Sequence, residues 1–191
     1  MEKINNNIIV LFAPGLGGHH ISNLLSTDTR FTQRANLEDY TTHLKKDTNA
    51  HIQLDINNEL TQKDDENRIL PLHIGVLLWN YEKIKKFKNR KILIVEFPNS
   101  KDSLAYKRFV NYNKNFDISD YMFHEQKLFY SQHIIEKLVP EKDFFIVKSE
   151  DIFNDNFDLF YNLTLNMNLK INYDMCKVMH SMWIQKIKES I

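Results

Sequence analysis

Three of the chain's four glycines lie within four residues of one another, at Gly15, Gly17 and Gly18. The continuous apolar run at 8–12 comes directly before them and is typical of a buried strand in a parallel sheet. Directly after them, residues 18–26 place apolar side chains on one side and polar side chains on the other at helical spacing. The glycines therefore predict a buried strand, a tight loop and an amphipathic helix, in that order.

A glycine-rich loop that opens a helix can hold an anion, because its backbone approaches a ligand closely and the helix start presents unpaired N–H groups. We therefore expect Gly15, Gly17, Gly18 and His19 to bind a phosphate or sulfate group. The alternative is a plain tight turn, in which the glycines serve only positive φ and close packing. ATPases and kinases of the Walker type have Lys and then Ser or Thr where this chain has His19 and His20, so those enzymes are disfavoured.

Three further segments have the apolar pattern of strands. They are 51–56, which alternates and is expected to be half exposed, and the unbroken runs 92–95 and 143–148. Because these strands alternate with helical patterns, we expect a single α/β domain over 1–191, with a mainly parallel sheet flanked by helices. The polar region 28–90 is expected to be an insertion.

Apolar residues at helical spacing predict four helices besides the one that follows the glycines. They cover 72–87, about 117–139, 157–165 and 172–187. Another helix should follow the strand at 92–95, with Asn99 or Ser100 as its cap and with buried residues at Leu104, Tyr106 and Phe109. The last helix is expected to bury one stripe of side chains: Met175, Val178, Met179, Met182, Trp183 and Ile187.

Composition disfavours several classes of function. The chain has 25 basic and 25 acidic residues, so it lacks the basic surplus of a protein that binds nucleic acid, and no sequence-specific nucleic-acid partner is expected. Cys176 is the only cysteine, which predicts no disulfide framework and makes the cytoplasm the expected location. No apolar run approaches the roughly 20 residues that cross a bilayer, so no membrane partner is expected. Cys176 and His180 have the spacing of two metal ligands, but two ligands do not make a site, so no metal is expected.

The order of these segments resembles the sulfotransferase-like branch of the P-loop fold. The resemblance covers three blocks, about 7–27, 91–109 and 143–187. In the family, the first strand leads into a loop of the form basic-Ser-Gly-Thr-Thr, and here 16–20 read Leu-Gly-Gly-His-His. The family's later strand ends in Arg-Asp-Pro, with a Ser about seven residues on, and here 96–98 read Glu-Phe-Pro and lead to Ser103.

The third block of the resemblance is a strand that runs into a Tyr-Glu-Asp-Leu-like segment, to which 149–152, Ser-Glu-Asp-Ile, are similar. The resemblance implies transfer of a sulfo group from 3′-phosphoadenosine 5′-phosphosulfate to a hydroxyl or amine acceptor. It places the backbone of Gly17, Gly18 and His19 on the phosphosulfate of this donor. It also implies that Ser103 and Arg108 bind the donor's 3′-phosphate and that His20 or His73 acts as the base.

Two substitutions relative to the family pattern favour an alternative. Leu16 stands where the family has a cation that meets the reacting sulfonate, and Glu96 stands where an Arg neutralises the 3′-phosphate. A chain that lacks both cations can be a P-loop fold that has lost its chemistry. The alternative is therefore a structural or assembly protein of a bacteriophage particle, with other virion proteins as partners, assembled in a host cytoplasm.

Overall fold

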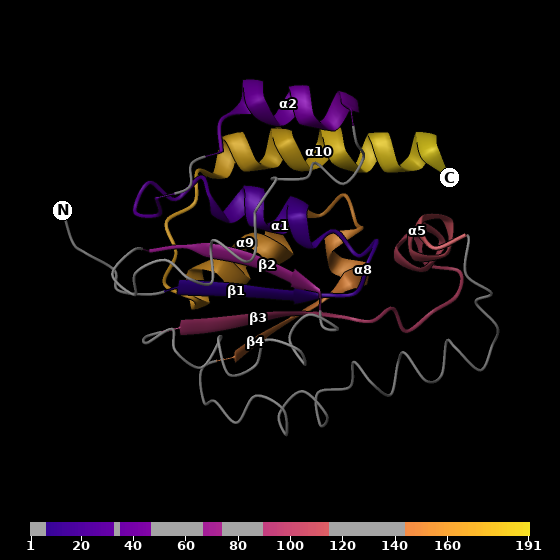
Figure 1. The fold of residues 1–191 in the computed structure, drawn as a ribbon, viewed down its shortest axis with the longest axis horizontal. Coiled ribbons are helices and arrows are strands. Elements are labelled where there is room, and N and C mark those ends of the chain that lie inside the picture. Colours follow the sequence, from indigo (N-terminus) through magenta and orange to yellow (C-terminus); the bar gives the residue numbers. More distant parts are fainter. Residues whose placement is uncertain (1–6, 33–34, 47–66, 74–89, 115–143) are drawn as a thin grey trace.

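A sheet of four parallel strands forms the centre of the computed structural model, which describes residues 7–32, 35–46, 67–73, 90–114 and 144–191 (Figure 1). The strand order is β2-β1-β3-β4. The bounds are β1 Asn7–Phe12, β2 Ile69–His73, β3 Arg90–Glu96 and β4 Phe144–Lys148. Helices flank this sheet, so the predicted α/β class with a parallel sheet is confirmed.

The first strand has the continuous burial that its apolar run predicted. Every residue of β1 is buried, which means that both faces of this strand are covered. β1 also has neighbours on both edges, since Ile9 pairs with Leu70 of β2 and with Ile92 of β3. The glycine loop that follows β1 therefore starts from the most enclosed strand of the described sheet.

The strand β2 corrects the prediction of a helix that begins at Leu72. Leu72 and His73 are the last two residues of β2, and Pro71 lies inside the strand opposite Val10. A proline is tolerated there because β2 is at the edge of the described sheet, where one side of the strand makes no ladder. This part of the region 28–90 thus belongs to the sheet. The predicted strand at 51–56 and the predicted helices at 74–87 and 117–139 lie outside the described residues.

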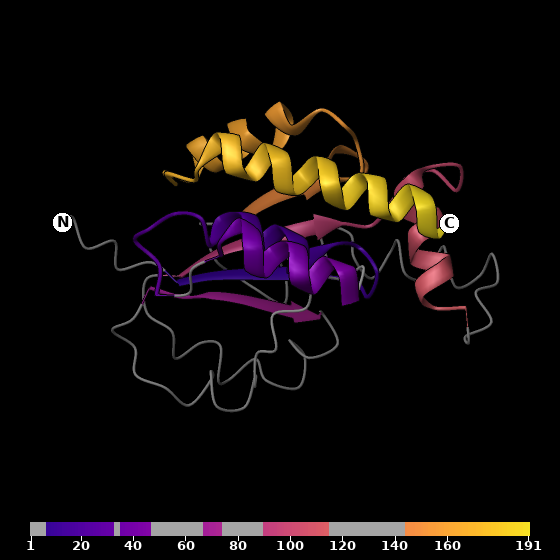
Figure 2. The ribbon, with the colours of Figure 1, turned by 90° about the horizontal axis from the view of Figure 1, so that it is seen from above.

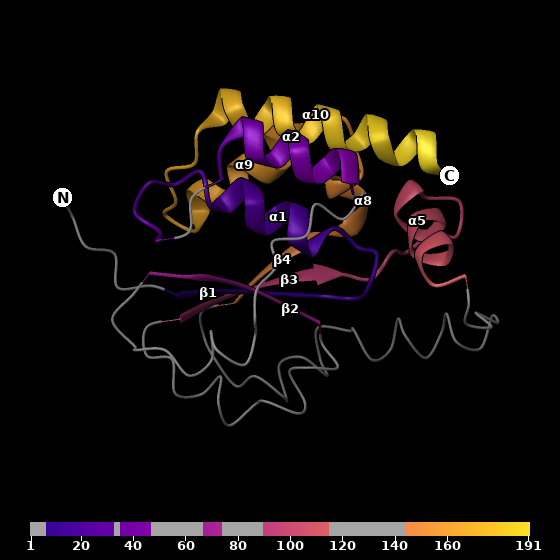
Figure 3. The ribbon, with the colours of Figure 1, turned by 45° about the horizontal axis from the view of Figure 1, so that its top comes forward.

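The helices α1 (Gly18–Leu25), α10 (Tyr173–Ser190) and α2 (Leu37–Lys46) stack outward from the sheet (Figures 1 and 3). Figure 2 shows the yellow α10 between the orange α9 (Phe157–Asn166) and the indigo and purple α1 and α2. None of the helices that the structure describes is both long and apolar enough to cross a membrane.

The predicted amphipathic helix is present as α1, but it is buried on nearly all sides. Its polar residues His20, Ser22 and Asn23 are buried together with the apolar ones. The reason is that α1 lies between the sheet and α10, and each layer covers one of its faces. The Ser22 hydroxyl is satisfied within the helix, where it donates to the carbonyl of Gly18 at 2.9 Å.

The buried stripe of α10 is rotated from the predicted one. It consists of Cys176, Met179, His180, Trp183, Ile184 and Ile187. Val178, which was predicted to be buried, is 47% exposed, and Met175 and Met182 are only partly buried. The rotation brings Cys176 and His180 into the core, where both make polar contacts with neighbouring elements.

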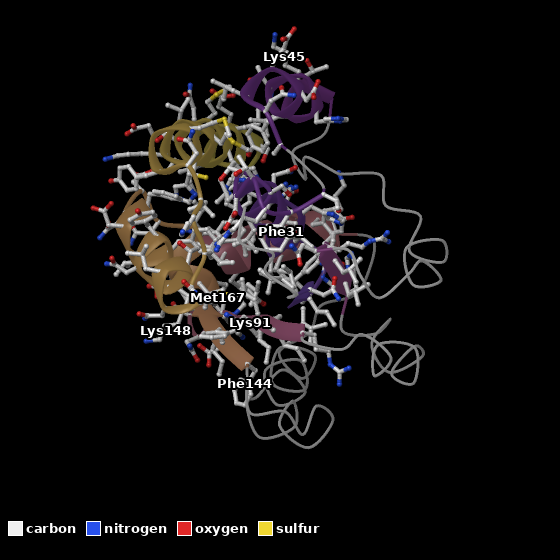
Figure 4. All side chains as sticks on the ribbon, turned by 90° about the vertical axis from the view of Figure 1, so that its left-hand side faces the viewer. Phe31, Lys45, Lys91, Phe144, Lys148 and Met167 are labelled. Atoms are coloured by element: carbon white, nitrogen blue, oxygen red, sulfur yellow. The ribbon has the colours of Figure 1, made fainter. Side chains whose placement is uncertain are left out.

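Two further connections hold the outer elements in place. Lys91 of β3 lies beside Met167 at the end of α9 (Figure 4), and its ammonium group donates to the Met167 carbonyl at 2.6 Å. A cation at the carboxyl end of a helix is a favourable arrangement. The helix α5 (Leu104–Tyr112) lies beyond the carboxyl ends of the strands, and Asn111 donates to the carbonyl of Ser190 at 2.9 Å.

Candidate functional site

The glycine loop lies at the point where the chain changes direction along the sheet. After β1, the chain adds β2 on one side of it and then β3 on the other. In open α/β sheets, ligands bind outside the carboxyl ends of the strands at such a switch point. The loop 13–17 leaves the carboxyl end of β1, so it occupies the position where this fold class places a ligand.

The backbone of the loop requires two of its glycines. Gly15 has a φ of 88° and Gly17 a φ of 76°, which is the left-handed region that other residues rarely adopt. Leu16 N–H donates to the carbonyl of Ala13 at 3.0 Å and closes the turn. Gly17 is the residue before α1, so the first N–H groups of this helix are at the loop and have no acceptor within the helix.

All three glycines are also required by close packing. A Cβ atom on Gly15 would lie 3.0 Å from Cβ of Tyr112, and one on Gly17 would lie 2.8 Å from the Trp183 ring. A Cβ atom on Gly18 would overlap the ring of Phe12. The missing side chains thus make room for aromatic rings of the same chain, which is what the plain-turn alternative expects.

The hollow in front of the loop is small. Its volume is about 10 Å³, which is room for roughly one water molecule. It is lined by Phe12, Gly15, Gly17, Gly18, His19, His73 and Tyr112. In this conformation the hollow admits no nucleotide.

Two histidines meet beside the hollow. The ring centroids of His19 and His73 are 6.1 Å apart, and both rings contact Phe12, at 5.3 Å and 4.6 Å. His73 is the last residue of β2, and the parallel pairing with β1 brings it level with Phe12. The structure therefore brings His73 to the loop, where it was predicted to lie. Its role as a base stays a prediction.

His20 lies away from the hollow. It has no exposed surface, and its Nδ1 is 2.8 Å from the hydroxyl of Tyr40 while its Nε2 is 3.2 Å from Nδ1 of His180. Its ring stacks on Trp183 at 4.2 Å. Burial, together with the nearby His180, holds the pKa of His20 well below its ordinary value. The geometry therefore offers His19 and His73, rather than His20, to a ligand at the loop.

The structure separates Ser103 from the loop and corrects the predicted cap of α5. Ser103 is the N-cap, in place of Asn99 or Ser100; its hydroxyl accepts from Tyr106 N–H at 3.1 Å and donates to the Ser100 carbonyl at 2.7 Å. Nine residues of helix, or about 14 Å, separate it from Tyr112 at the hollow.

The opposite end of α5 packs on the loop. Tyr112 lines the hollow, and Asn113 donates to the carbonyl of Pro14 at 3.2 Å. Arg108 is buried, and its guanidinium carbon is 5.6 Å from the centroid of the Tyr112 ring. The ring of Tyr112 thus contacts Arg108 and also lines the hollow. Sequence reasoning missed Tyr112 and Asn113, because neither belongs to a motif.

The two positions that lack the family's cations have different surroundings. Leu16 is part of the hydrophobic core. Glu96 ends β3, and since Leu11 pairs with Ile94, it stands level with Ala13 at the start of the loop. Its register partner on the other side is Lys148.

The pair considered as metal ligands is engaged elsewhere. The Cys176 thiol is 3.1 Å from the Thr27 hydroxyl, and burial raises the pKa of the thiol to about 11. His180 contacts His20 and the carbonyl of Asn154. Within the described ranges, no three His, Cys, Asp or Glu side chains gather as metal ligands would.

Comparisons with family models, with curated proteins and with solved structures found no match to this chain.

Proposed function

We propose that the protein is a sulfotransferase-like group transferase of P-loop topology. The observation that carries the proposal is the β1–loop–α1 unit at the switch point, with His19 and His73 meeting beside the first turn of α1. This arrangement combines N–H groups for an anion with imidazoles for proton transfer. The parallel sheet, with the loop strand between two neighbours, supports the topology.

In the proposed reaction, the phosphosulfate of 3′-phosphoadenosine 5′-phosphosulfate binds at the amides of Gly17, Gly18 and His19. The acceptor oxygen or nitrogen forms a bond to sulfur as the bond from sulfur to the bridging phosphate oxygen breaks. His73 accepts the proton that the acceptor loses. The phosphate leaves with added negative charge, which the positive end of α1 stabilises.

The donor requires a wider hollow than the described one. Tyr112 is the side chain that can provide it, because its ring is 39% exposed at the last residue of α5. A rotation of this ring away from Gly15 would open the loop toward Arg108, which the resemblance assigns to the 3′-phosphate. Ser103, assigned to the same phosphate, would stay about 14 Å along the helix.

The second candidate function is a structural or assembly protein that keeps the topology as a scaffold, for instance in a bacteriophage particle. The observation that favours it is the packing of Gly15, Gly17 and Gly18 against aromatic rings, which explains the glycines without a ligand. The absence of a cation at two family positions also favours the structural protein, since Leu16 is part of the core and Glu96 stands at the loop.

Binding of adenosine 3′,5′-bisphosphate separates the two candidates. We expect weak binding to the wild type and an improvement of about 1 kcal/mol or more in Glu96→Arg, because the substitution replaces repulsion of the 3′-phosphate by attraction. Calorimetry measures both affinities. Glu38→Arg is the control, since it makes the same change of charge on the exposed surface of α2. Tight binding to the wild type would support the sulfotransferase-like enzyme, and no binding to either protein would support the structural protein.

A simple anion tests the loop alone. In crystals soaked with sulfate or phosphate, we expect an anion at the N–H groups of Gly18 and His19, because the first turn of α1 is the positive end of the helix. Anions at other positions, with this one empty, would contradict an anion site at the loop.

A further inference from the structure

Four groups from four parts of the fold form one buried chain of hydrogen bonds. The Tyr40 hydroxyl of α2 is 2.8 Å from His20 Nδ1 of α1. His20 Nε2 is 3.2 Å from His180 Nδ1 of α10, and His180 Nε2 is 2.7 Å from the carbonyl of Asn154, which follows α8 (Ser149–Ile152). Tyr40, His20 and His180 are at most 2% exposed.

The carbonyl at the end of this chain fixes the direction of every proton. A carbonyl can only accept, so His180 carries its proton on Nε2, and its Nδ1 is then an acceptor in the neutral ring. His20 must therefore donate from Nε2, which leaves its Nδ1 to accept from the Tyr40 hydroxyl. With both rings neutral, each hydrogen bond has one donor and one acceptor.

Protonation of either ring breaks this order. A proton on His180 Nδ1 would point at the N–H of His20, 3.2 Å away, and His20 could accept it only by moving its own proton to Nδ1, opposite the Tyr40 hydroxyl. A proton on His20 Nδ1 would point at the hydroxyl hydrogen of Tyr40, which would have to turn away. In both cases a charge would stand in a buried site, which is unfavourable without a partner.

The attachment of helix α2 depends on these hydrogen bonds more than that of the other elements does. It is the outermost layer (Figure 1), and Tyr40 and Leu44 are the buried side chains among those of α2 that the structure describes. Lys45, by contrast, points away from the molecule (Figure 4). Few buried contacts give an element a low local stability, so loss of the Tyr40 contact would release α2 first.

We propose that the Tyr40–His20–His180 chain is an acid-sensitive latch, which holds α2 against α1 and α10 while both imidazoles are neutral and releases α2 when the pair takes up a proton. His20 also stacks on Trp183, whose ring contacts Gly17, so the latch reaches the back of the glycine loop. The proposal is independent of the proposed function.

The groups around the pair agree with the direction of the switch. Burial lowers the pKa of both rings, and the nearby His180 lowers the pKa of His20 further. The hydrogen bond to the Asn154 carbonyl and, next to it, the carboxylate of Asp155 both oppose the lowering of the His180 pKa. The other faces are formed by Tyr40 of α2, Trp183 of α10 and the Phe157 ring of α9, which carry no charge near neutral pH.

The sign of the pH dependence follows from these shifts. The unfolded chain binds protons at the ordinary histidine pKa of about 6.5, while the folded pair binds them only at lower pH. The latch therefore contributes fully above about pH 6.5, and its contribution declines as the pH falls below that value.

Hydrogen exchange of the full chain tests the latch. Between about pH 7.5 and pH 5.5, we expect the protection factors of the α2 amides to fall at least about tenfold relative to those of β1, which corresponds to one proton taken up over one pH unit. In His180→Gln the fall should be smaller than in the wild type, because glutamine offers a donor and an acceptor but binds no proton, which leaves His20 as the one titrating ring of the Tyr40–His20–His180 chain. His43→Gln, an exposed site on the same helix α2, is the matched control and should behave as the wild type.

Two further measurements do not depend on the folding of His180→Gln. Nitrogen-15 NMR of the wild type at about pH 7.5 should show His20 and His180 as neutral rings with the proton on Nε2. Tyr40→Phe should have low α2 protection already at pH 7.5, with no further fall on acidification. A charged ring or an Nδ1–H form at pH 7.5, unchanged α2 protection in the wild type, or equal effects of His43→Gln and His180→Gln would each overturn the latch.

Discussion

Replacement of Trp183 by alanine is expected to lower the free energy of unfolding by about 3 to 5 kcal/mol. The indole is 1% exposed and lies at the junction of three elements. It stacks on His20 of α1 at 4.2 Å, and its ring centroid is 4.8 Å from that of Phe153 after α8. A cavity of this size cannot close, because α1 is also held by the sheet.

Chemical denaturation measures this loss, and Val178→Ala on the same helix is the control. Val178 is 47% exposed, so its truncation should change the free energy of unfolding by no more than about 0.5 kcal/mol. Equal effects of the two substitutions would contradict the orientation of α10. In a Trp79→Phe background, iodide should leave the Trp183 fluorescence of the native protein unquenched.

Replacement of Gly18 by valine is expected to lower the free energy of unfolding by about 3 kcal/mol or more. Gly18 has no positive φ, so the cause is not backbone strain. The new Cβ atom would overlap the ring of Phe12, which is buried at the end of β1. Either β1 and α1 separate or the ring leaves its rotamer.

The denaturation midpoint of Gly18→Val should therefore fall well below that of the wild type. Thr42→Val, which places the same side chain at an exposed position of α2, should stay within about 0.5 kcal/mol of the wild type. An unchanged midpoint in Gly18→Val would show that the loop is not tightly packed.

The sequence was sufficient for the elements whose pattern is local. The strands β1, β3 and β4 each contain an unbroken apolar run, and the glycine loop predicted the start of α1. The strand β2 was not predicted, because a proline within the short segment Ile-Leu-Pro-Leu-His indicates the boundary of an element rather than the middle of a strand. Only the pairing with β1, which lies 61 residues earlier, makes this segment a strand.

The burial of polar residues could not be predicted from local patterns. On α10, exposed Val178 and partly buried Met182 have apolar side chains, while the buried His180 has a polar one. Its polar atoms are satisfied by His20 and Asn154, which are distant in the sequence. The same holds for the site. Both His73 and His20 were predicted to lie at the loop, and His73 does. His20 instead contacts side chains on other helices, which the local pattern does not indicate.

The enclosure of α1 by α10 has a consequence for synthesis of the chain. His20 and His180 are 160 residues apart, and Thr27 and Cys176 are 149 apart. At about 5 to 20 residues per second, the ribosome completes α10 roughly 8 to 33 seconds after α1. During this interval the apolar sides of α1 lack their final cover, and long-range contacts of this kind slow folding. The nascent chain is therefore expected to expose these sides to chaperones until α10 emerges, and stalling before α10 would leave the β1–loop–α1 unit open to aggregation.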